Sequence, residues 1–495
     1  MKLSSPTIDI PPDDPFKNDK LGRSDIEPSL TQLISRSSSS FVLSIDGAWG
    51  TGKTTFLDMW KVKLEHEKHI CLKFNAWETD FAEDPLIVLV HELSTKLKEV
   101  NNVFNPTAEN LRKATGSILK RSIPAAVKVF TAGLIENSDV EKVFATLTES
   151  LAEDSIKAYE EGYSAINEFR QTLSQVVQEI SKEENKKIII IVDELDRCRP
   201  SYAIELLERI KHLFNIDGVV FILGIDRTQL AESVKVLYGS NFDASGYLKR
   251  FIDIDYSLPE PKPTNSYFDY LFEHYEIYQL LQYNDDARNN LKDIKNDDPK
   301  VLEALFKASN FSLRDQIQTV SRLSIILKTI PKDEPIFFRG MLVLLFLREW
   351  KRELYRGLIE RSINSDAILK EFNSILSKID KLPRHQQGGK SLASEVEALL
   401  IVGIGEINLD AQGNPISPRK LIESIKEKTL DYLKSYYDMT DDGEFNPSSP
   451  YPQEKVGFKT NIKRLELLNQ FQFKQFQFAE PRYKTRWETN AQHIK

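Results

Sequence analysis

Short apolar runs alternate with longer amphipathic stretches over the first half of the chain. Each run has five to seven residues and is rich in β-branched side chains, which is typical of a strand buried on both faces. The predicted strands are Phe41–Ile45, Ile70–Phe74, Ile188–Val192, Val219–Ile225 and Phe251–Tyr256. Helical spacing of apolar residues follows at Thr54–Lys63, Ser201–Phe214, Glu232–Tyr238 and Tyr247–Arg250. Strands separated by helices predict an α/β fold with a five-stranded, mostly parallel sheet.

The pattern changes at Pro259–Pro263, after which the apolar spacing is helical. Predicted helices there are Tyr267–Leu281, Pro299–Ala308, Arg314–Leu327 and Phe337–Glu360. We therefore divide the chain into a polar leader (1–18), an α/β core (19–262), an α-helical lid (263–330) and a mostly helical C-terminal domain (331–495). The core also carries a helical insertion at about 100–181, because its second and third strands are separated by far more residues than a crossover needs.

Two features of the C-terminal domain leave alternatives open. Phe471–Phe478 (FQFKQFQF) alternates aromatic and polar residues, which predicts a half-buried strand packed on the helical domain. The same aromatic tail, or Tyr436 with Tyr437, could instead stack on bases or pair with a partner strand. The mild basic excess after residue 478 gives only weak support for nucleic-acid contact.

No stretch of the sequence predicts a transmembrane helix. Ile123–Ile135 is apolar but has 13 residues and contains Pro124 and Lys128, whereas a span needs about 20 apolar residues. Met341–Leu347 is shorter still and is expected in a core. The polar, proline-rich start lacks the apolar segment of a signal peptide. These features predict a cytoplasmic protein.

The composition is that of an ordinary globular protein, with 41% hydrophobic and 28% charged residues among 495. A formal net charge of −8 argues against a protein that coats a polyanion. The two cysteines, Cys71 and Cys198, are far apart, so neither a zinc site nor a disulfide framework is expected. A reducing compartment fits this cysteine content.

The strongest motif lies between the first predicted strand and the helix that follows it. Gly47–Thr54 (GAWGTGKT) matches the phosphate-binding pattern G-x-x-x-x-G-K-[ST] in full. The glycines let main-chain amides surround phosphates, Lys53 reaches the β- and γ-phosphates, and the Thr54 hydroxyl binds Mg²⁺. The predicted nucleotide-binding residues are Gly47, Trp49, Gly50, Thr51, Gly52, Lys53, Thr54 and Thr55.

The third predicted strand ends in two acids, Asp193 and Glu194. An apolar strand followed by an acid is the pattern of a Walker B motif. Asp193 at the carboxyl end of the strand can hold Mg²⁺, so the predicted metal ligands are Thr54 and Asp193. Glu194 is placed to orient or deprotonate the attacking water and is the predicted catalytic base.

These segments resemble the KAP family of P-loop NTPases, which is similar to the AAA+ and STAND ATPases. The matching segments, in family order over roughly residues 15–330, are Asp19–Arg23 (DKLGR), Gly47–Gly50 (GAWG), Phe74–Trp77 (FNAW), Val192–Cys198 (VDELDRC), Gly224–Arg227 (GIDR), Arg250–Asp253 (RFID) and Leu258–Pro259.

The resemblance implies an ATPase with an additional catalytic strand between the phosphate-loop strand and the Walker B strand. It also implies that Asp226 lies near the γ-phosphate, in the sensor position. Alternatively, Asp226 only caps the helix that follows. Several family members carry transmembrane helices between the two Walker motifs; Ile123–Ile135 is too short for that, so a member without them is predicted.

Hydrolysis usually needs a further positive charge on the γ-phosphate, often an arginine from a neighbouring subunit. Candidates are Arg197, Arg199, Arg250 and Arg314. Arg250 precedes the fifth predicted strand, where related AAA+ proteins keep this arginine, and Arg314 resembles a lid arginine. We select these two as catalytic candidates; a surface salt bridge is the alternative for either.

The predicted function is therefore a Mg²⁺-dependent ATPase that acts as a molecular switch or assembly ATPase. ATP is preferred over GTP, because Ser377–Asp380 (SKID) matches a guanine-selecting motif only superficially and lies far from the sheet. A homo-oligomer, or a complex with a separate effector protein, is expected. Resemblance to bacterial KAP-like proteins adds defence against phage as a role.

Two other functions remain open from the sequence. A non-hydrolysing, ATP-gated scaffold could recruit a separate effector or nucleic acid, and Glu194 discriminates this from an ATPase. A small-molecule kinase would need an acceptor-binding motif, which the sequence does not show. Residues 331–495 contain no recognisable nuclease, deaminase or protease constellation.

Overall fold

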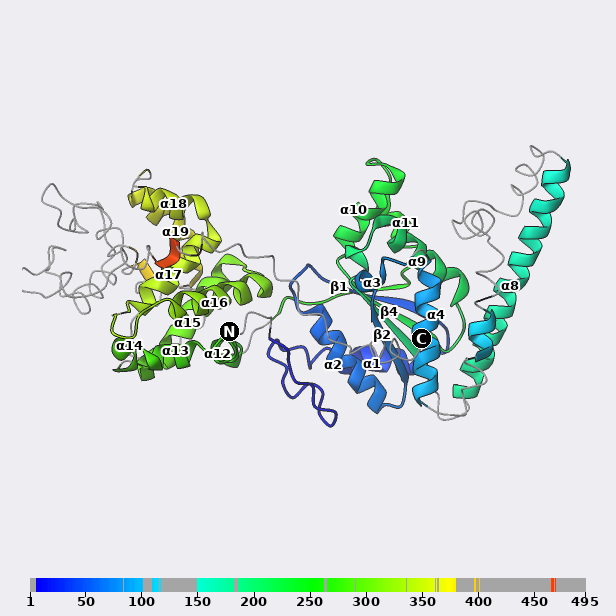
Figure 1. Ribbon diagram of the computed structural model, residues 1–495, viewed down its shortest axis with the longest axis horizontal. Helices are drawn as coiled ribbons and strands as arrows, with labels where there is room; N and C mark the ends of the chain where they lie inside the picture. Colours follow the sequence, from blue (N-terminus) through cyan, green and yellow to red (C-terminus); the bar gives the residue numbers. More distant parts are fainter. Residues whose placement is uncertain are drawn as a thin grey trace, which may run out of the picture. The chain divides into compact units, whose positions relative to one another are not determined.

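The structure is a computed structural model. It describes residues 6–100 except 83, residues 109–114, 116 and 149–181, residues 186–379 except 262–264, 290, 335, 361, 363 and 364, and the positions 396, 397, 400, 464–466 and 468. The chain forms two compact units: Ile8–Lys262, and Pro263–Lys495 together with Met1–Thr7 (Figure 1).

A five-stranded parallel sheet forms the centre of the first unit and confirms the predicted fold class. Its strands are β1 (Phe41–Asp46), β2 (Ile70–Asn75), β3 (Ile188–Asp193), β4 (Val219–Ile225) and β5 (Ile254–Ser257). They lie in the order β2-β3-β4-β1-β5, and every described pair is parallel. The strand β4 thus separates β1 from β3, which confirms the additional strand between the phosphate-loop strand and the Walker B strand.

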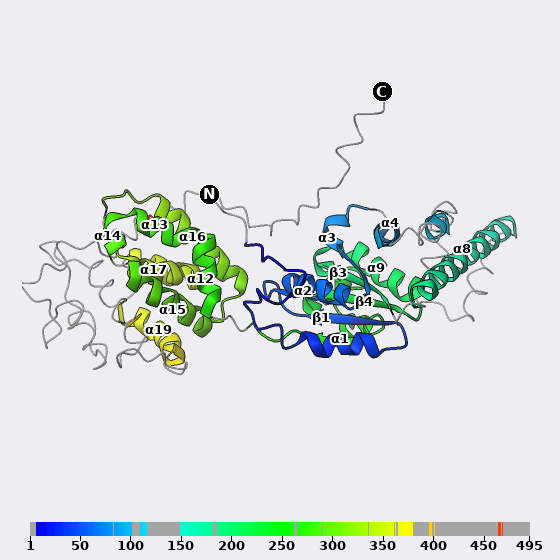
Figure 2. The same ribbon diagram turned by 90° about the horizontal axis from the view of Figure 1, so that it is seen from below.

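Two helices cover one face of this sheet, α1 (Glu27–Arg36) and α2 (Lys53–His66) (Figure 2). Because side chains alternate along a strand, every second residue reaches this face. The resulting core cluster includes Leu43, Ile45, Ile189, Ile191, Val220 and Ile222 from the strands and Ile34, Leu57 and Trp60 from the helices. These are the β-branched and aliphatic positions that made the strands readable in the sequence.

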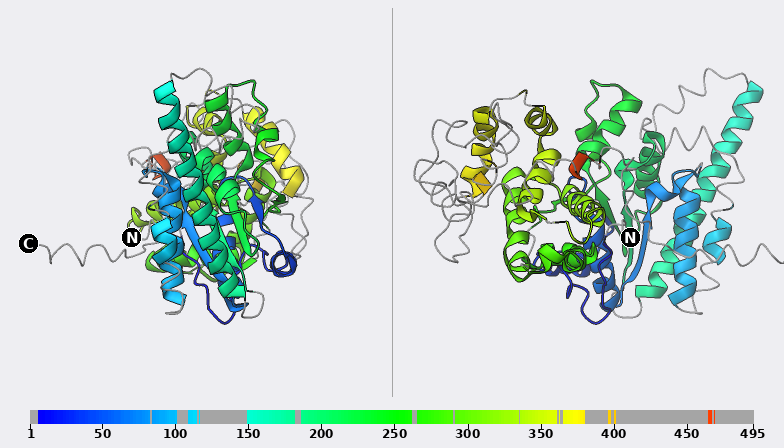
Figure 3. Two further views of the ribbon diagram at one scale, coloured as in Figure 1. Left: turned by 90° about the vertical axis from the view of Figure 1, so that its right-hand side faces the viewer. Right: turned by 60° about the vertical axis from the view of Figure 1, so that its left-hand side comes forward.

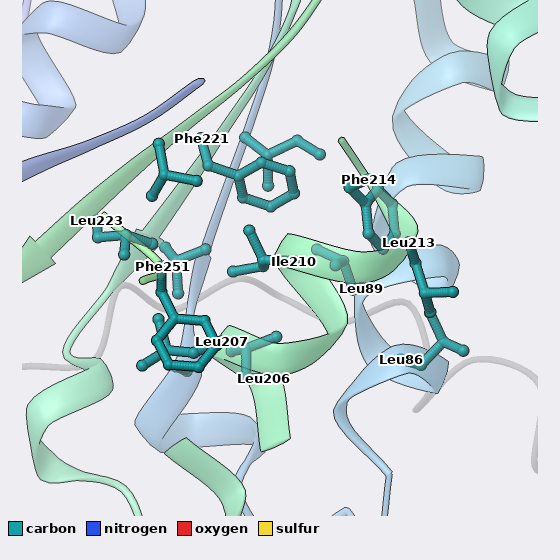
Figure 4. Close-up of a cluster of buried hydrophobic side chains, with 14 of the residues drawn as sticks. Leu86, Leu89, Leu206, Leu207, Ile210, Leu213, Phe214, Phe221, Leu223 and Phe251 are labelled. Carbon is teal, nitrogen blue, oxygen red and sulfur yellow. The ribbon is translucent and has the colours of Figure 1, made fainter. Parts of the chain in front are cut away.

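The opposite face is covered by α4 (Pro85–Val100), α8 (Glu149–Ser181), α9 (Pro200–Leu213), α10 (Arg227–Tyr238) and α11 (Ala244–Leu248). Figure 4 shows Phe221 and Leu223 of β4 on the side of Ile210 of α9, with Leu86 and Leu89 of α4 beside them. The long helix α8 stands next to α4 at the outside of this layer (Figure 3). Because both faces of the sheet are buried, the strands are held in place, and so are the loops that follow their carboxyl ends.

The fifth strand differs from its prediction. It begins at Ile254, not at Phe251, because Phe251 and Ile252 are buried in the turn after α11. Asp253 then bonds to the backbone of Val42 through both its amide and its carboxylate, which sets the register of β5 against β1. As an edge strand it shows alternating exposure, so its apolar content was a weaker guide to its bounds.

The second unit is helical. It contains α12 (Asn265–His274), α13 (Ile277–Tyr283), α14 (Asp285–Asn289), α15 (Leu291–Ser309), α16 (Leu313–Lys328), α17 (Phe338–Trp350), α18 (Arg352–Ile359) and α19 (Ser365–Ile379). Nearly every residue of α17 is buried, as expected for Met341–Leu347. The helices α15 and α16 of the predicted lid pack against α17, so a division at residue 330 stays a prediction.

Three helix predictions for this unit need correction. Tyr267–Leu281 is two helices, because Glu276 has a left-handed backbone (φ 61°) that stops α12 and starts α13. Phe337–Glu360 is also two, divided at the extended residue Lys351. Conversely, α15 begins at Leu291 and contains Pro299 in its interior, although proline usually marks a helix start.

No helix among the described residues is long and apolar enough to cross a membrane. Several predicted segments lie outside the described residues: Ile123–Ile135, the loops 383–391, 408–418 and 440–457, the pair Tyr436 and Tyr437, and the strand Phe471–Phe478. These stay predictions.

Candidate nucleotide site

The phosphate loop joins β1 directly to α2 at the carboxyl edge of the sheet. Gly50 and Gly52 adopt left-handed backbones (φ 81° and 85°), a conformation that costs glycine little and other residues more. The amide of Gly47 donates to Ile225 O at 3.1 Å, which ties the start of the loop to β4. Gly52, a fixed glycine of the motif, and Gly50, at one of its variable positions, therefore shape a backbone turn that side chains would oppose.

The N-terminus of α2 offers its amides to a ligand. Its capping residue is Gly52, and no side chain caps the first turn. Thr51 instead donates its hydroxyl to Ala48 O at 2.9 Å, within the loop, and Thr54 is exposed. First-turn amides that no side chain caps attract an anion, and so does the helix dipole. Both fit a phosphate at this position.

Lys53 directs its charge into the loop. Its Nζ donates to Gly47 O, and to Ala48 O at 3.2 Å. Burial lowers the pKa of Lys53, and the carboxylates Asp196, Asp226, Asp193 and Asp46 act the other way. Lys53 therefore lies in the electrostatic neighbourhood of two of the predicted site residues, Asp193 and Asp226.

Asp193 ends β3 and is almost completely buried, with 2% of its surface exposed. One carboxylate oxygen accepts from the amide of Glu194 at 3.0 Å, and the other faces Lys73 Nζ at 3.2 Å. Among the described residues no group of three or more His, Cys, Asp or Glu could hold a metal. One carboxylate and one hydroxyl, Asp193 and Thr54, fit Mg²⁺, which keeps several waters and uses phosphate oxygens as further ligands.

Lys73 is a residue of this site that sequence reasoning missed. It lies on β2 with its side chain 11% exposed, and its Nζ contacts Asp58 of α2 at 2.6 Å as well as Asp193. Burial alone would lower the pKa of Lys73, but Asp193 and Asp58 outweigh it and raise the pKa. The signal was a lysine inside the apolar run ICLKF, where a charge needs a partner.

Glu194 is held by two partners. Asn75 Nδ2 donates to one carboxylate oxygen at 2.9 Å, and Arg197 Nη1 lies 2.8 Å from the other. Its backbone is left-handed (φ 61°), which is uncommon outside glycine and frequent at functional sites. Burial raises the pKa of Glu194, while Arg197 and Asn75 oppose the increase. The neighbouring acids Asp193 and Glu194 thus have separate surroundings.

Two tryptophans complete this side of the site. Trp49 of the phosphate loop donates its Nε1 to Asp196, and Trp77 lies in α3 (Ala76–Thr79), directly after β2. The Arg197 guanidinium lies over both rings, 5.7 Å from each centroid. Trp49 and Trp77 are 41% and 39% exposed, so core packing does not account for them.

Asp226 makes the helix cap that the sequence analysis gave as the alternative to a sensor role. It caps α10, accepting from the amides of Thr228 at 3.1 Å and Gln229 at 3.2 Å. It is also among the carboxylates that act on Lys53. A cap does not exclude a sensor, so the role of Asp226 stays a prediction.

The arginine candidates lie in different surroundings. Arg197 is engaged within its own chain by Glu194, and Arg199 contacts Asp80 and Ala82 O. Arg250 is exposed, with its guanidinium 5.8 Å from the ring of Tyr247. Arg314, at the start of α16, belongs to the other unit. The roles of Arg250 and Arg314 stay predictions.

Arg23 is a second residue whose role the sequence did not reveal. Its buried guanidinium donates to Thr51 O in the phosphate loop at 3.2 Å and to Pro259 O after β5. Asp19 holds the preceding turn through the amides of Leu21 and Arg23. The segment Asp19–Arg23 therefore holds the phosphate loop in place. In the sequence, only its resemblance to a family motif indicated that it matters.

A sequence profile of the KAP family P-loop domain matches residues 23–331, more than half of the chain. The chain belongs to the KAP family of P-loop NTPases. The match covers the phosphate loop, the acidic end of β3 and all five strands of the sheet.

Individual relatives are distant. The chain is 24% identical over 253 residues to the phage T7 exclusion protein of Escherichia coli K12, which covers 47% of this chain and a third (33%) of that protein. It is 25% identical over 197 residues to the uncharacterized protein MJ0182 of Methanocaldococcus jannaschii, 36% of this chain and 98% of that one. A solved structure, the ORC2 protein of Aeropyrum pernix, aligns with 10% identity and a TM-score of 0.26 over 83% of this chain and 95% of that chain.

Proposed function

We propose that this KAP family protein binds ATP with Mg²⁺ and hydrolyses it. The observation that carries the proposal is the position of Lys53. Its charge lies inside a glycine loop at a helix N-terminus, in the same electrostatic neighbourhood as Asp193. A strand residue of β4, Gly224, lies in register with Asp193 and leaves room between β3 and α2 for that carboxylate.

Each residue would contribute a defined step. The amides of the loop and α2 bind the phosphates, and Lys53 neutralises their charge. Thr54 and Asp193 would hold Mg²⁺, which would supply positive charge to offset the negative charge of the phosphates. Glu194 orients a water molecule and accepts its proton as the water oxygen attacks the γ-phosphorus; ADP and phosphate leave.

The biological role we propose is a switch or assembly ATPase in defence against phage. Support for defence is the relative named as a phage exclusion protein, which matches over only part of its length. Support for assembly is the exposed guanidinium of Arg250, which could complete the site of a second copy. The proposed location is the cytoplasm, where the buried thiols Cys71 and Cys198 would stay reduced.

A second candidate is an ATP-gated scaffold that does not hydrolyse its nucleotide. One observation favours it: both carboxylate oxygens of Glu194 are engaged, by Asn75 and Arg197. A base in that position must exchange a partner for water before it can act. A protein that only binds ATP would have no need for this exchange.

Three proteins decide between these functions: wild type, Lys53→Met and Glu194→Gln. Nucleotide affinity is measured with a fluorescent ATP analogue, and turnover by release of inorganic phosphate. We expect Lys53→Met to weaken binding by about 100-fold, and Glu194→Gln to bind like wild type while turnover falls by about 10²–10³-fold. Tight binding without phosphate release in wild type would instead establish the scaffold.

The oligomeric state is tested with the same proteins by light scattering with and without ATP–Mg²⁺. Glu194→Gln should remain assembled in ATP if assembly depends on the bound triphosphate, and Arg250→Ala should bind ATP but assemble less. For the defence role, phage plating is compared on bacteria that express wild type or Glu194→Gln. Equal plating on both strains and on an empty control would reject that role.

A further inference from the structure

Arg197 closes a short loop of chain onto Glu194. The 3₁₀ turn η2 (Leu195–Arg197) begins right after Glu194 and brings Arg197 Nη1 to 2.8 Å from the carboxylate. The second carboxylate oxygen is held by Asn75, which also caps α3 by accepting from the amide of Trp77 at 3.0 Å. Glu194 is therefore positioned by the ends of two strands, β2 and β3.

The same guanidinium reaches a third segment, the phosphate loop. It lies over the ring of Trp49 as well as that of Trp77, at 5.7 Å from each centroid. Attraction of a cation to an aromatic face is favourable but weak at a partly exposed site. The neighbouring Asp196 adds a hydrogen bond from Trp49 Nε1. Two consecutive residues, Asp196 and Arg197, therefore join the loop to the Walker B strand.

Core packing does not explain these tryptophans. About two-fifths of each surface is exposed, whereas Trp60 of α2 is fully buried among apolar side chains. What Trp49 and Trp77 share is the guanidinium of Arg197. The side chain of Arg197 is itself only 20% exposed, so its charge is committed to partners within its own chain.

We propose that Arg197 is a positioning residue that sets the carboxylate of Glu194 and couples it to the phosphate loop through Trp49. The coupling part rests on the proposed function, because it assigns Glu194 as the base. A shift of Trp49 when the loop closes on phosphates changes the surface that holds the guanidinium, and the guanidinium carries the change to Glu194. Arg197 thus acts within its own subunit and is not directed at a neighbour's phosphate.

The kinetic test compares Arg197→Met and Arg197→Lys with wild type in the full chain. Arg197→Met removes the charge and the stacking plane, so we expect turnover to fall by about 10–100-fold while nucleotide affinity and KM change less than about threefold. Arg197→Lys restores the charge toward Glu194 without the planar group and should recover part of the turnover. Arg170→Met, at an exposed position of α8, is the matched control and should behave as wild type.

The spectroscopic test does not need hydrolysis. Trp49→Phe keeps an aromatic face for Arg197 but removes the indole emission of the loop. Four tryptophans remain, Trp60, Trp77, Trp350 and Trp487, so the signal of Trp77 is the part of the nucleotide-dependent emission that is lost in Trp49→Phe/Trp77→Phe. We expect ATP–Mg²⁺ to change the emission of Trp77, and this part of the change to be lost in Trp49→Phe/Arg197→Met as it is in Trp49→Phe/Trp77→Phe.

The outcomes separate the two proposals. If wild type binds ATP without releasing phosphate, the ATPase fails, and the emission change alone decides whether Arg197 couples the loop to α3. If wild type hydrolyses ATP but Arg197→Met matches Arg170→Met in turnover, or loses only nucleotide affinity, the positioning role is wrong. Thermal unfolding of each variant shows whether it is folded; should Arg197→Met be unfolded, the Arg197→Lys split between turnover and KM carries the test.

Discussion

The two neighbouring acids at the end of β3 are held in contrasting ways. The side proposed to hold Mg²⁺, here called the metal side, is made by Asp193, Lys73 and Asp58. It is an ion cluster between β2, β3 and α2, and Asp193 is 2% exposed. The base side, made by Glu194, Asn75 and Arg197, lies against two tryptophans that are about 40% exposed. One side places its carboxylate in the core, and the other borders two partly exposed tryptophans.

Under the proposed function, this difference suits residues one peptide bond apart to different tasks. A carboxylate fixed by a buried lysine cannot move without uncovering that charge, so Asp193 suits a ligand that must stay in one place. Glu194 is held by a neutral amide and by an arginine that keeps two tryptophan rings as partners when the carboxylate moves, so an exchange of partners uncovers less charge. Rigidity on the metal side and adjustability on the base side are what a regulated hydrolase would need.

The largest effect should separate the two sides directly. Asp193→Asn removes the charge that would hold Mg²⁺, so we expect turnover to fall by about 10³-fold and ATP affinity to become the same with Mg²⁺ and with EDTA. Glu194→Gln should keep the Mg²⁺ dependence of binding. Titrating the fluorescent nucleotide in both buffers measures this, and an identical Mg²⁺ response in the two variants would show that the sides are not distinct.

Lys73→Met tests the ion cluster as a structural element. Without its lysine, the buried Asp193 faces Asp58 with no cation between them, and the free energy of unfolding should fall by about 2–3 kcal/mol. This is below the cost for a fully buried pair because the Asp58 side chain is 43% exposed. Urea unfolding measures it. Lys61→Met, which breaks only the surface pair with Glu65, should lose less than about 0.5 kcal/mol.

Added Mg²⁺ sharpens this test. If Asp193 binds the ion, Mg²⁺ should return part of the stability of Lys73→Met and little to wild type, because the variant has a free carboxylate charge at the site. An equal response of both proteins would mean that Lys73 and the ion do not share Asp193.

Gly224→Ala should disturb the metal side alone. A Cβ at this residue of β4 would lie 2.5 Å from Leu57 Cδ1 and 2.8 Å from Asp193 Oδ1, and both neighbours are buried. We expect a loss of about 1–2 kcal/mol in unfolding free energy and a weaker Mg²⁺ dependence of nucleotide binding. The emission response of Trp77 should be unchanged. A variant as stable as wild type would show that Asp193 is freer than its packing implies.

The smallest effect extends the comparison to a buried carboxyl with a hydroxyl as its partner. Glu208 of α9 accepts from Tyr247 Oη at 3.3 Å, and burial raises the pKa of Glu208 although this bond opposes it. The folded state therefore binds a proton more readily than the unfolded chain. Stability then falls as the pH rises from the ordinary glutamate pKa, about 4.3, through the raised pKa.

Glu208→Gln removes that dependence. At neutral pH the variant should melt roughly 1–3 °C above wild type, and below about pH 4 the two should coincide. The exposed Glu232→Gln is the control and should show no pH-dependent difference. Calorimetry at several pH values measures both. A destabilised variant at neutral pH would mean that the charge of Glu208 is favourable in the fold.

The sequence predicted what repeats locally and missed what meets across the fold. Apolar runs located β1 to β4 to within a residue. The motif located the loop from Gly47 to Thr54, because the turns of the loop backbone require glycine. Lys73 and Asp193 are 120 positions apart, so their pairing could be found only in three dimensions. The turn at Glu276 could not be predicted either, because nothing in the sequence distinguishes a glutamate with a left-handed backbone from a helical one.

The contacts of Arg23 connect the phosphate loop to the end of this unit. Its guanidinium bonds to the peptide oxygen of Thr51, which lies where the triphosphate is expected, and to that of Pro259, three residues before this unit ends at Lys262. The guanidinium of Arg23, which is rigid and planar, therefore contacts both the loop and the chain that leaves this unit. A nucleotide bound as proposed would therefore act on a residue that precedes the first strand and also holds the chain after the last one.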